Sequence, residues 1–200
     1  MKLIDISRDL RVTEVYPGDP ETVIDRIRTI GCDSDCNLTA AYACLHAGTH
    51  VDAPMHFIEN GNDVLSYDPE VFFGSCTVVE IKDSPITGEF IDRHFPKNAE
   101  RILIKGGGEV TFMGSSAEEA SKLGLKLIGT DASSVGVHGD QIKPHKSFLM
   151  NGTAILEGLD LSEVKPGNYF LIAFPVKISG VDGSPVRAFL ADEYIFWTKK

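Results

Sequence analysis

The sequence is poor in cysteine, in positive charge and in long apolar runs, and each shortage excludes a class of protein. Four cysteines among 200 residues are too few for the disulfide framework of a small secreted domain. With 29 Asp and Glu against 19 Lys and Arg, the formal net charge is -10, which argues against nucleic acid and anionic membrane surfaces as partners. No apolar run approaches the ~20 residues of a transmembrane helix.

The N-terminal segment also lacks the unbroken apolar stretch of a secretory signal. The first residues, MKLIDISRDL, place Asp and Arg within it, so a cytoplasmic protein is expected. No repeat, low-complexity block or Pro/Ser-rich linker divides the chain, and one domain over residues 1–200 is the prediction. A hydrophobic fraction of 42% is enough for a core without disulfides.

The arrangement of the cysteines favours free thiols. Cys32 and Cys36 lie four residues apart in GCDSDC, whereas Cys44 and Cys76 are isolated in apolar surroundings. A zinc knuckle needs two close pairs, and only one loose pair is present. A structural or redox role for Cys32 and Cys36 is the alternative interpretation.

Short β-branched runs bounded by Gly, Pro or Asp predict a strand-rich chain. Examples of these runs cover residues 3–7, 22–30, 76–81, 101–105, 125–129, 153–159 and 168–174. Helices are expected over residues 88–95, 117–122 and 141–150. The helix over 117–122 follows a capping box, with Ser116 as the N-cap and Glu119 at N3.

The order of these elements predicts the fold class. The helix over 117–122 lies between two strands, which is typical of a parallel pair joined by a crossover. The N-terminal strands follow one another without helices, so we expect them to be antiparallel. Together the pattern predicts a mixed α/β fold with more strand than helix.

Two loops have an unusual composition. Residues 16–20, Tyr-Pro-Gly-Asp-Pro, predict a rigid exposed turn in which Tyr16 is a candidate for covering a ligand. The run 106–108, three glycines, suggests a phosphate-binding loop. However, it has neither a following Lys-Ser/Thr nor the spaced glycines of a dinucleotide fingerprint. A flexible strand-to-helix connection is the favoured interpretation.

Chemistry concentrates in one stretch of eleven residues, HAGTHVDAPMH, which contains His46, His50, Asp52 and His56. Gly and Pro within it argue against a continuous helix. In an extended segment His50 and Asp52 point to the same side, and His46 lies at an even offset from both. Two imidazoles and one carboxylate are a common ligand set for Zn²⁺ and also suit Mn²⁺ or Fe²⁺. The stretch therefore predicts a metal site with positions left for water.

Residue spacing alone does not assign a role to the remaining candidates. His56 follows Pro54, which can turn the chain, so it is either a fourth ligand or a general base beside a metal-bound water. Glu157 ends an apolar run and needs a partner if it is buried; otherwise it is an exposed strand-end carboxylate. His94 and His138 are interpreted as residues outside the site, with a site role for His138 left open.

At HAGTHVDAPMH the sequence resembles the signature of the metal-dependent cyclase family, H-x-G-T-H-x-D-x-P-x-H, and matches every fixed position. This family includes bacterial kynurenine formamidases and isatin hydrolases. The resemblance extends along the chain. It includes YPGD near the N-terminus, LIGTDASSV, AILEGL, and PVKI followed by DGSPVRA, at residues 16–19, 127–135, 154–159, 175–178 and 182–188.

Carried over by motif position, the resemblance implies a role for each site residue. One metal would bind His46, His50 and Asp52, and a second would bind Asp52, Glu157 and His145, the last lying twelve residues before Glu157 as in the formamidases. His56 would match the catalytic histidine. One or two divalent ions are implied, with Zn²⁺ as the first choice and Mn²⁺ as an alternative.

The resemblance also implies a fold, an activity and an assembly. The fold would be an α/β sandwich with a β-rich core and flanking helices, of the swivelling β/β/α kind. The activity would be hydrolysis of an aryl-formamide or cyclic amide, with N-formylkynurenine, an intermediate of tryptophan catabolism, as the first substrate. The expected assembly is a homodimer or homotetramer with the pocket near a subunit interface.

Two departures from the family pattern concern the substrate rather than the metal. Tyr16 stands where formamidases often carry Trp, and the stretch after Lys105 is short. Alternatives are therefore an isatin-hydrolase-like or other cyclic-amide hydrolase, a cyclase, and a non-catalytic metal-binding member of the fold. A redox protein using Cys32 and Cys36 is a further class.

Overall fold

The structure is a computed structural model that describes residues 2–32 and 34–192. The strands are β1 (Leu3–Asp5), β2 (Val23–Arg28), β3 (Leu38–Tyr42), β4 (His50–Asp52), β5 (Phe73–Glu80), β6 (Arg101–Lys105), β7 (Leu127–Thr130), β8 (Ala154–Glu157), β9 (Gly167–Ile172), β10 (Gly183–Pro185) and β11 (Phe189–Ala191). The helices are α1 (Gly88–His94), α2 (Gly114–Ser121) and α3 (Ile142–Met150). Three 3₁₀ turns follow β4: η1 (Pro54–His56), η2 (Val64–Ser66) and η3 (Pro69–Phe72).

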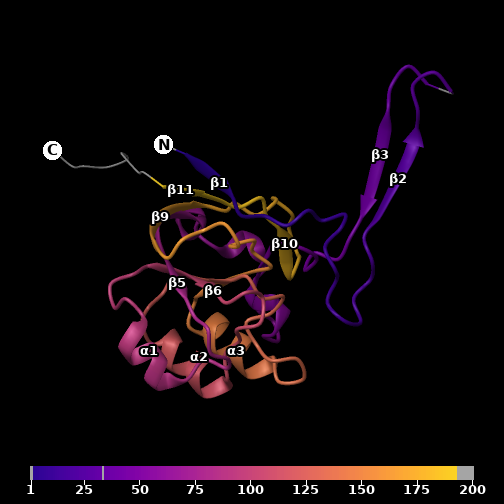
Figure 1. Cartoon of the computed structure of the whole chain (residues 1–200). Coiled ribbons are helices and arrows are strands. Elements are labelled where there is room, and N and C mark those ends of the chain that lie inside the picture. The colour runs from indigo at the N-terminus through magenta and orange to yellow at the C-terminus, as the bar shows by residue number, and fades with distance from the viewer. Residues whose placement is uncertain (1, 33, 193–200) are drawn as a thin grey trace.

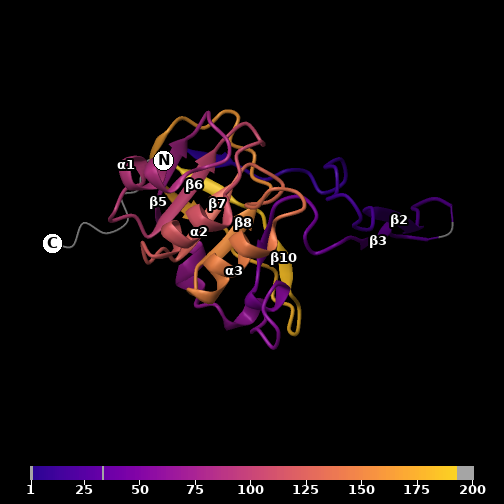
Figure 2. The same ribbon diagram turned by 90° about the horizontal axis from the view of Figure 1, so that it is seen from below.

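Nine of the described strands form one curled mixed sheet in the order β1-β11-β9-β5-β6-β7-β8-β4-β10. Strands β5, β6, β7 and β8 are mutually parallel, and every other pairing in this sheet is antiparallel. Helix α2 connects β6 to β7 as a crossover, which confirms the predicted parallel pair. Figure 1 and Figure 2 show α1, α2 and α3 together on one face of the sheet. The mixed α/β fold with more strand than helix is confirmed.

The central strands bury both faces, and their side chains alternate between two apolar clusters. In β6, Ile102 and Ile104 pack toward the helices, whereas Leu103 packs into the cluster enclosed by the curl of the sheet. In β8, Ile155 joins the helix side and Leu156 the opposite side. This explains why these runs read as continuous apolar sequence rather than as a polar–apolar alternation.

The helix boundaries agree with the prediction to within one residue at α1 and α3 and differ more at α2. Helix α2 begins at Gly114 rather than after Ser116, because Met113 is its N-cap residue. The Ser116 hydroxyl lies inside the first turn and donates to the Met113 carbonyl at 3.0 Å. The predicted capping box was therefore wrong about which residue starts the helix, although the helix itself is present. Ser116 is buried, and its local backbone bond satisfies it there.

The triple-glycine loop after β6 is held in place by a carboxylate. Gly106, Gly107 and Gly108 point their amide N–H groups at the buried Asp131 carboxylate, with donor–acceptor distances of 2.9 to 3.2 Å. Gly107 and Gly108 have φ of +67° and +85°, a region that favours glycine. A Cβ on Gly106 would lie 2.4 Å from the Val110 side chain. The loop is therefore the strand-to-helix connection that was expected, from β6 to α2, but it is an anion-binding turn that the chain's own carboxylate holds in place.

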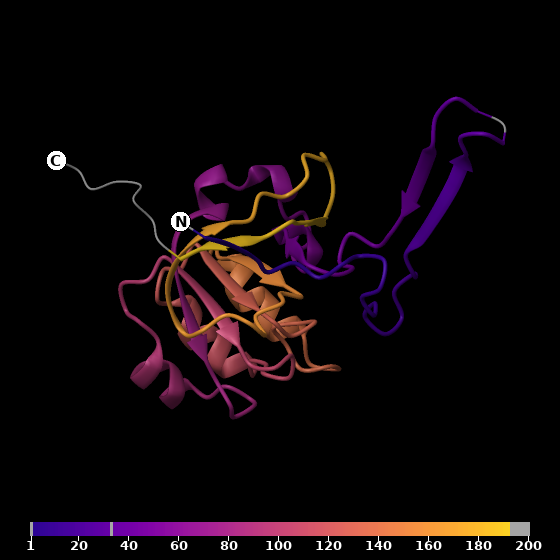
Figure 3. The ribbon, with the colours of Figure 1, turned by 45° about the horizontal axis from the view of Figure 1, so that its top comes forward.

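Strands β2 and β3 form an antiparallel hairpin outside the main sheet, as expected for the N-terminal strands. Figure 1 and Figure 3 show this hairpin projecting away from the body. Each residue of both strands is exposed. The exposed apolar side chains include Val23, Ile24, Ile27, Leu38 and Tyr42.

None of the helices among residues 2–32 and 34–192 has the length and apolar character needed to cross a membrane.

Candidate metal centre

The register of three neighbouring strands creates the centre. Strand β4 pairs with β8 on one side and β10 on the other, so that His50 lies opposite Glu157 and Asp52 lies opposite Gly183. Since side chains alternate along β4, His50 and Asp52 project to the same face, as predicted. The side chains of His50, Asp52 and Glu157 are all buried.

His46 precedes β4 and His56 follows it, and both side chains join His50 and Asp52. The backbone that leads to each of them is bent rather than extended. Gly48, with φ +66°, bends the backbone before the strand, and Pro54 opens the η1 turn that ends with His56. The extended-chain reason for placing His46 with His50 and Asp52 was therefore wrong, although the three residues do converge. The His46 and His56 rings stack with centroids 3.9 Å apart.

A second glycine lets the chain before β4 pass close to the end of β8. Gly158 has φ +66°, and a Cβ there would lie 2.1 Å from the Gly48 carbonyl oxygen. The Thr49 hydroxyl donates to the Gly158 carbonyl at 2.6 Å across this contact. The close approach holds the turn that carries His46 against the strand that ends in Glu157.

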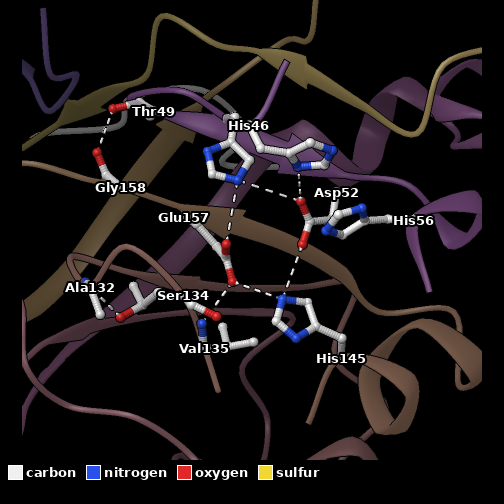
Figure 4. Close-up of polar contacts among 12 residues, drawn as sticks. His46, Thr49, Asp52, His56, Ala132, Ser134, Val135, His145, Glu157 and Gly158 are labelled. Carbon is white, nitrogen blue, oxygen red and sulfur yellow. Dashed lines mark hydrogen bonds and ion pairs between the residues drawn. The ribbon is translucent and has the colours of Figure 1, made fainter. Parts of the chain in front are cut away.

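Asp52 is the centre of the cluster (Figure 4). Its Oδ1 lies 2.9 Å from His46 Nδ1 and 3.5 Å from His50 Nε2. Its Oδ2 lies 3.4 Å from His145 Nε2, contributed by α3. Among residues 2–32 and 34–192 this Oδ2 atom has no hydrogen-bond partner although the side chain is fully buried.

Glu157 forms the second carboxylate of the cluster. Its Oε1 accepts a hydrogen bond from the Val135 amide at 2.7 Å and lies 3.2 Å from His145 Nε2, while Oε2 lies 3.3 Å from His50 Nε2. Burial alone would raise the pKa of this carboxyl, but hydrogen bonds and charge from His145 and His50 hold the pKa well below its usual range. Glu157 is therefore buried and ionised, which resolves the alternative of an exposed strand-end residue.

Backbone carbonyls orient two of the histidines. His50 Nδ1 lies 3.0 Å from the Gly48 carbonyl, and His145 Nδ1 lies 2.7 Å from the Gln141 carbonyl. In each ring Nδ1–H donates to the carbonyl, which leaves Nε2 directed at the carboxylates. This is the arrangement that histidine ligands of metals adopt, with one nitrogen held and the other free to coordinate.

Charge in the cluster is balanced by histidine. Burial opposes protonation of His46, yet the Asp52 carboxylate and then Asp182 raise its pKa to about 9. Burial likewise opposes protonation of His145, and Glu157 and Asp52 raise its pKa to about 9. The two buried carboxylates thus require positive charge beside them. A divalent cation carries two positive charges and can supply it.

The residues fit a divalent cation by donor type and spacing. One group of candidate ligand atoms comes from His46, Asp52 and His56, and another from His50, Asp52 and Glu157; within each group the atoms lie within 4.8 Å of one another. Asp52 belongs to both groups, and its buried Oδ2, which has no hydrogen-bond partner among residues 2–32 and 34–192, is an atom that a cation would satisfy. Imidazole and carboxylate donors suit Zn²⁺ and, with more carboxylate, Mn²⁺.

Among the histidines of the cluster, His56 has the most exposed side chain. Burial lowers its pKa below the ordinary value; Asp52 opposes this, and the charges of His46 and His145 add to it. Its side chain is 27% exposed and lines a pocket of about 320 Å³ above the cluster. A neutral imidazole at that place can accept a proton from a molecule in the pocket.

Tyr16, from the loop before β2, lines the same pocket. Its hydroxyl lies 2.5 Å from His138 Nδ1, which joins this loop to the loop before α3. Burial, with the negative charges of Glu157 and Asp19, raises the pKa of Tyr16, so the phenol stays protonated. Tyr16 therefore lines the pocket as expected for a residue that covers a ligand, and His138 contacts it from outside the candidate ligand set.

Sequence reasoning missed Asp182, which precedes β10. Its Oδ2 lies 3.2 Å from His46 Nε2 and 3.5 Å from His56 Nδ1, and it also lines the pocket. Asp182 belongs to the DGSPVRA segment, but nothing in that segment alone indicates a histidine partner 136 residues away. The sequence feature that could have pointed to Asp182 as a site residue is its place in the matched DGSPVRA segment, directly before a glycine.

The remaining candidates lie elsewhere. His94 ends α1 and its Nδ1 contacts the Phe90 carbonyl at 3.0 Å. Cys32 and Cys36 are exposed free thiols near the tip of the β2–β3 hairpin, Cys76 is a buried free thiol, and Cys44 is a partly buried free thiol at the pocket wall.

The chain is similar along its length to known bacterial enzymes. The chain is 36% identical over 208 residues to a kynurenine formamidase of Salinibacter ruber and 32% identical over 205 residues to one of Sphingopyxis alaskensis. Each alignment covers 96% of this chain and 98% of the relative.

Solved structures share the fold. A potential metal-dependent hydrolase with cyclase activity superposes with a TM-score of 0.84 at 25% identity, covering 96% of this chain and 98% of that chain. Isatin hydrolase A from Labrenzia aggregata superposes with a TM-score of 0.81 at 18% identity, covering 96% and 94%. At that lower identity the likeness concerns the fold alone.

The model of the Cyclase family matches residues 4–104, which include β4 and the histidine-rich stretch around it. This match covers half of the chain, and the full-length relatives exceed 30% identity. The chain therefore belongs to the cyclase family.

Proposed function

We propose that this protein is a metal-dependent hydrolase of an aryl-formamide, with N-formylkynurenine and water as substrates and kynurenine and formate as products. The observation that carries the chemistry is the buried cluster around Asp52, whose Oδ2 has no hydrogen-bond partner among the described residues. The substrate assignment rests on full-length relatives that are kynurenine formamidases.

The metal ligands proposed are His46, His50 and Asp52 for one ion, and Asp52, Glu157 and His145 for a second. One or two ions per subunit are compatible with this set, with Zn²⁺ as the first choice and Mn²⁺ as the alternative. A cation held there supplies Lewis-acid charge that lowers the pKa of a water to roughly 7 and polarises a carbonyl. Asp52 holds the two halves of the ligand set together through its two oxygens.

His56 is the proposed general base and acid. Because its pKa is lowered, its ring is neutral near pH 7 and accepts the proton of the attacking water. The water oxygen forms a bond to the formyl carbon, the carbon–nitrogen bond breaks, and His56 returns the proton to the leaving nitrogen. The ring also lies within ligand range of Asp52 and His46, so metal content must be measured together with turnover in any His56 variant.

Tyr16 is the proposed substrate-binding residue. It lines the same pocket as His56, and its protonated hydroxyl together with the ring offers both a hydrogen bond and an apolar surface to an aryl group. The bond to His138 fixes the position of the phenol.

Assays on the purified protein test the proposal. Metal content is measured first, and hydrolysis of N-formylkynurenine and of isatin is then followed by absorbance. Turnover of N-formylkynurenine is expected. Turnover of isatin alone would assign the site to a cyclic amide, and full metal content without activity on either would favour a binding protein. A rate that depends on the oxidation of Cys32 and Cys36 would favour a redox protein.

The assembly proposed is a homodimer or homotetramer with the pocket near a subunit interface. The support is the projecting β2–β3 hairpin, since two isolated strands are marginal in water and these expose several apolar side chains. Light scattering should give a mass of at least twice 21.8 kDa, and a monomer mass at micromolar concentration would contradict the proposal. A cytoplasmic location and a single domain over 1–200 stay predictions; the free thiols are compatible with a reducing compartment.

A further inference from the structure

We infer that Asp182 is a positioning residue that holds the imidazole of His46, and through the same oxygen the ring of His56, in the orientation that the metal centre requires. The inference rests on the proposed function only in taking the cluster around Asp52 as a metal centre. It concerns a residue outside the proposed ligand set.

Three histidines of the cluster that are buried or nearly buried have their rings held in different ways. His50 and His145 each have one ring nitrogen held by a backbone carbonyl, at 3.0 and 2.7 Å, and the other directed at the carboxylates. His46 has its Nδ1 on Asp52, and its Nε2 lies 3.2 Å from Asp182 Oδ2. For His46, therefore, Asp182 occupies the place that a backbone carbonyl occupies for the other two rings.

Asp182 is itself anchored through its backbone. Its carbonyl accepts a hydrogen bond from the Ala53 amide at 2.8 Å, directly after the strand that carries Asp52. Two residues earlier, the Gly180 amide donates to the Asp63 carboxylate at 2.7 Å. The carboxylate is thus held by a hydrogen-bonded backbone, although its side chain is 45% exposed to solvent.

The glycine that follows Asp182 makes room for the ring of His46. Gly183 pairs with Asp52 in the sheet, and a Cβ added there would lie 2.5 Å from His46 Cε1 and 2.9 Å from His46 Nε2. Only glycine leaves room for the ring of His46 beside β10. The pair Asp182–Gly183 therefore both admits the ring and orients it.

The same carboxylate oxygen lies 3.5 Å from His56 Nδ1, and His46 and His56 are stacked. One carboxylate thus contacts the outer edges of both rings. An Nδ1–H on His56 directed at Asp182 leaves Nε2 as the proton acceptor, which is how an outer carboxylate selects the tautomer of a catalytic histidine.

Metal affinity provides a test that does not depend on the substrate. Wild-type protein, Asp182→Ala, Asp182→Asn and the control Asp92→Ala, on the exposed surface of α1, are stripped with a chelator and titrated with Zn²⁺ against a chromophoric chelator. Co²⁺ absorption spectra then report the coordination sphere. Loss of an outer partner of a metal ligand weakens affinity about 10- to 100-fold, which is the decrease expected for Asp182→Ala.

Asp182→Asn should recover most of that affinity, because its amide oxygen still accepts from His46 Nε2–H, and its Co²⁺ spectrum should match the wild type. Gly183→Ala should weaken Zn²⁺ binding as well, with Asp182 still present. An Asp182→Ala affinity within about twofold of wild type would overturn the inference. So would an Asn variant as weak as Ala with an altered Co²⁺ spectrum, since Asp182 would then be a direct ligand. Wild-type protein that binds neither ion would refute the metal centre, and the inference with it.

Discussion

Two buried carboxylates in this molecule have opposite surroundings. Asp131, 5% exposed, accepts hydrogen bonds from the amides of three consecutive glycines. Asp52, fully buried, has an oxygen without a hydrogen-bond partner among residues 2–32 and 34–192, and three histidine rings lie around its carboxylate. Backbone amides satisfy the Asp131 carboxylate, whereas the Asp52 carboxylate depends on positive charge that the backbone does not supply. Burial of a carboxylate therefore does not by itself indicate a metal site. A buried carboxylate oxygen without a hydrogen-bond partner does indicate one.

The comparison also explains why the glycine run resembles a ligand loop. Three successive amides directed at one point bind any anion, whether a phosphate or a carboxylate of the same chain. Here the anion is Asp131, at the end of β7, which also offers its carbonyl oxygen to the Arg8 guanidinium. The loop therefore anchors residues 131–135, where the Val135 amide meets Glu157. Its contribution to the site is structural and indirect.

The largest effect is expected from removing Asp52, the carboxylate with an oxygen that lacks a hydrogen-bond partner among the described residues. Asp52→Ala should lower metal affinity by more than about 100-fold, above the loss caused by an outer partner, because both groups of candidate ligand atoms include Asp52. Turnover should fall with it. Elemental analysis after gel filtration measures this, with Asp92→Ala as the control. A fully metallated, active Asp52→Ala protein would refute the role of Asp52.

Removing the base beside this carboxylate should separate turnover from metal binding. His56→Ala should lose about 10²- to 10⁴-fold in kcat, the value of proton transfer by a placed histidine, while keeping its metal. Steady-state kinetics and elemental analysis on the same preparation check this. Equal loss of metal and activity would make His56 a ligand instead.

Removing the completed carboxylate should affect stability instead. Asp131→Asn loses charge-assisted hydrogen bonds to the glycine amides, and we expect it to cost about 2 to 3 kcal/mol of unfolding free energy. Urea denaturation of the metal-free protein measures the loss. Metal affinity of the folded variant should stay near the wild-type value; a loss as large as that of Asp52→Ala would remove the distinction between the two carboxylates.

Metal addition should stabilise every protein that keeps Asp52. At a free metal concentration of 100 times Kd, linkage gives about 2.7 kcal/mol, which corresponds to a rise in Tm of roughly 5 to 10 °C for a chain of this size. Thermal denaturation with and without chelator should show this rise in the wild type and in Asp131→Asn. Asp52→Ala should show little of it, and an equal rise there would place the metal elsewhere.

The smallest effect is expected at the pocket wall, away from both carboxylates. Tyr16→Phe removes the hydroxyl that contacts His138 but keeps the ring, so KM should rise by about five- to tenfold, as for one lost hydrogen bond, with kcat and metal content nearly unchanged. His138→Ala serves as the matched variant, because it leaves the Tyr16 hydroxyl present but unpositioned. A large fall in kcat in Tyr16→Phe would instead place this phenol in the chemical step.

Local pattern predicted much of this molecule because its main causes are local. Alternation along β4 placed His50 and Asp52 on one face. The apolar run ending in Glu157 indicated that this carboxylate needs a partner if it is buried, but left its burial open. The order of strand and helix around α2 predicted the parallel pair of β6 and β7.

What could not be predicted depends on contacts between distant segments. Asp182 meets His46 only because β10 pairs with β4, and Asp131 meets the glycine loop only because β7 lies beside β6. The bend at Gly48 likewise brings His46 to Asp52 by a route that residue spacing does not reveal. In each case the sequence contains the residue, and the sheet determines its partner.

The register of β8, β4 and β10 has a consequence for how such a protein can diversify. His50, Asp52 and Glu157 are fixed to one another by the ladders of neighbouring strands, whereas Tyr16, Ser133 and Gln141 line the pocket from the loops around them. Loops can change length or residue without shifting a strand register. The reaction centre and the substrate selection are therefore separable parts, and one can be inherited intact while the other is exchanged.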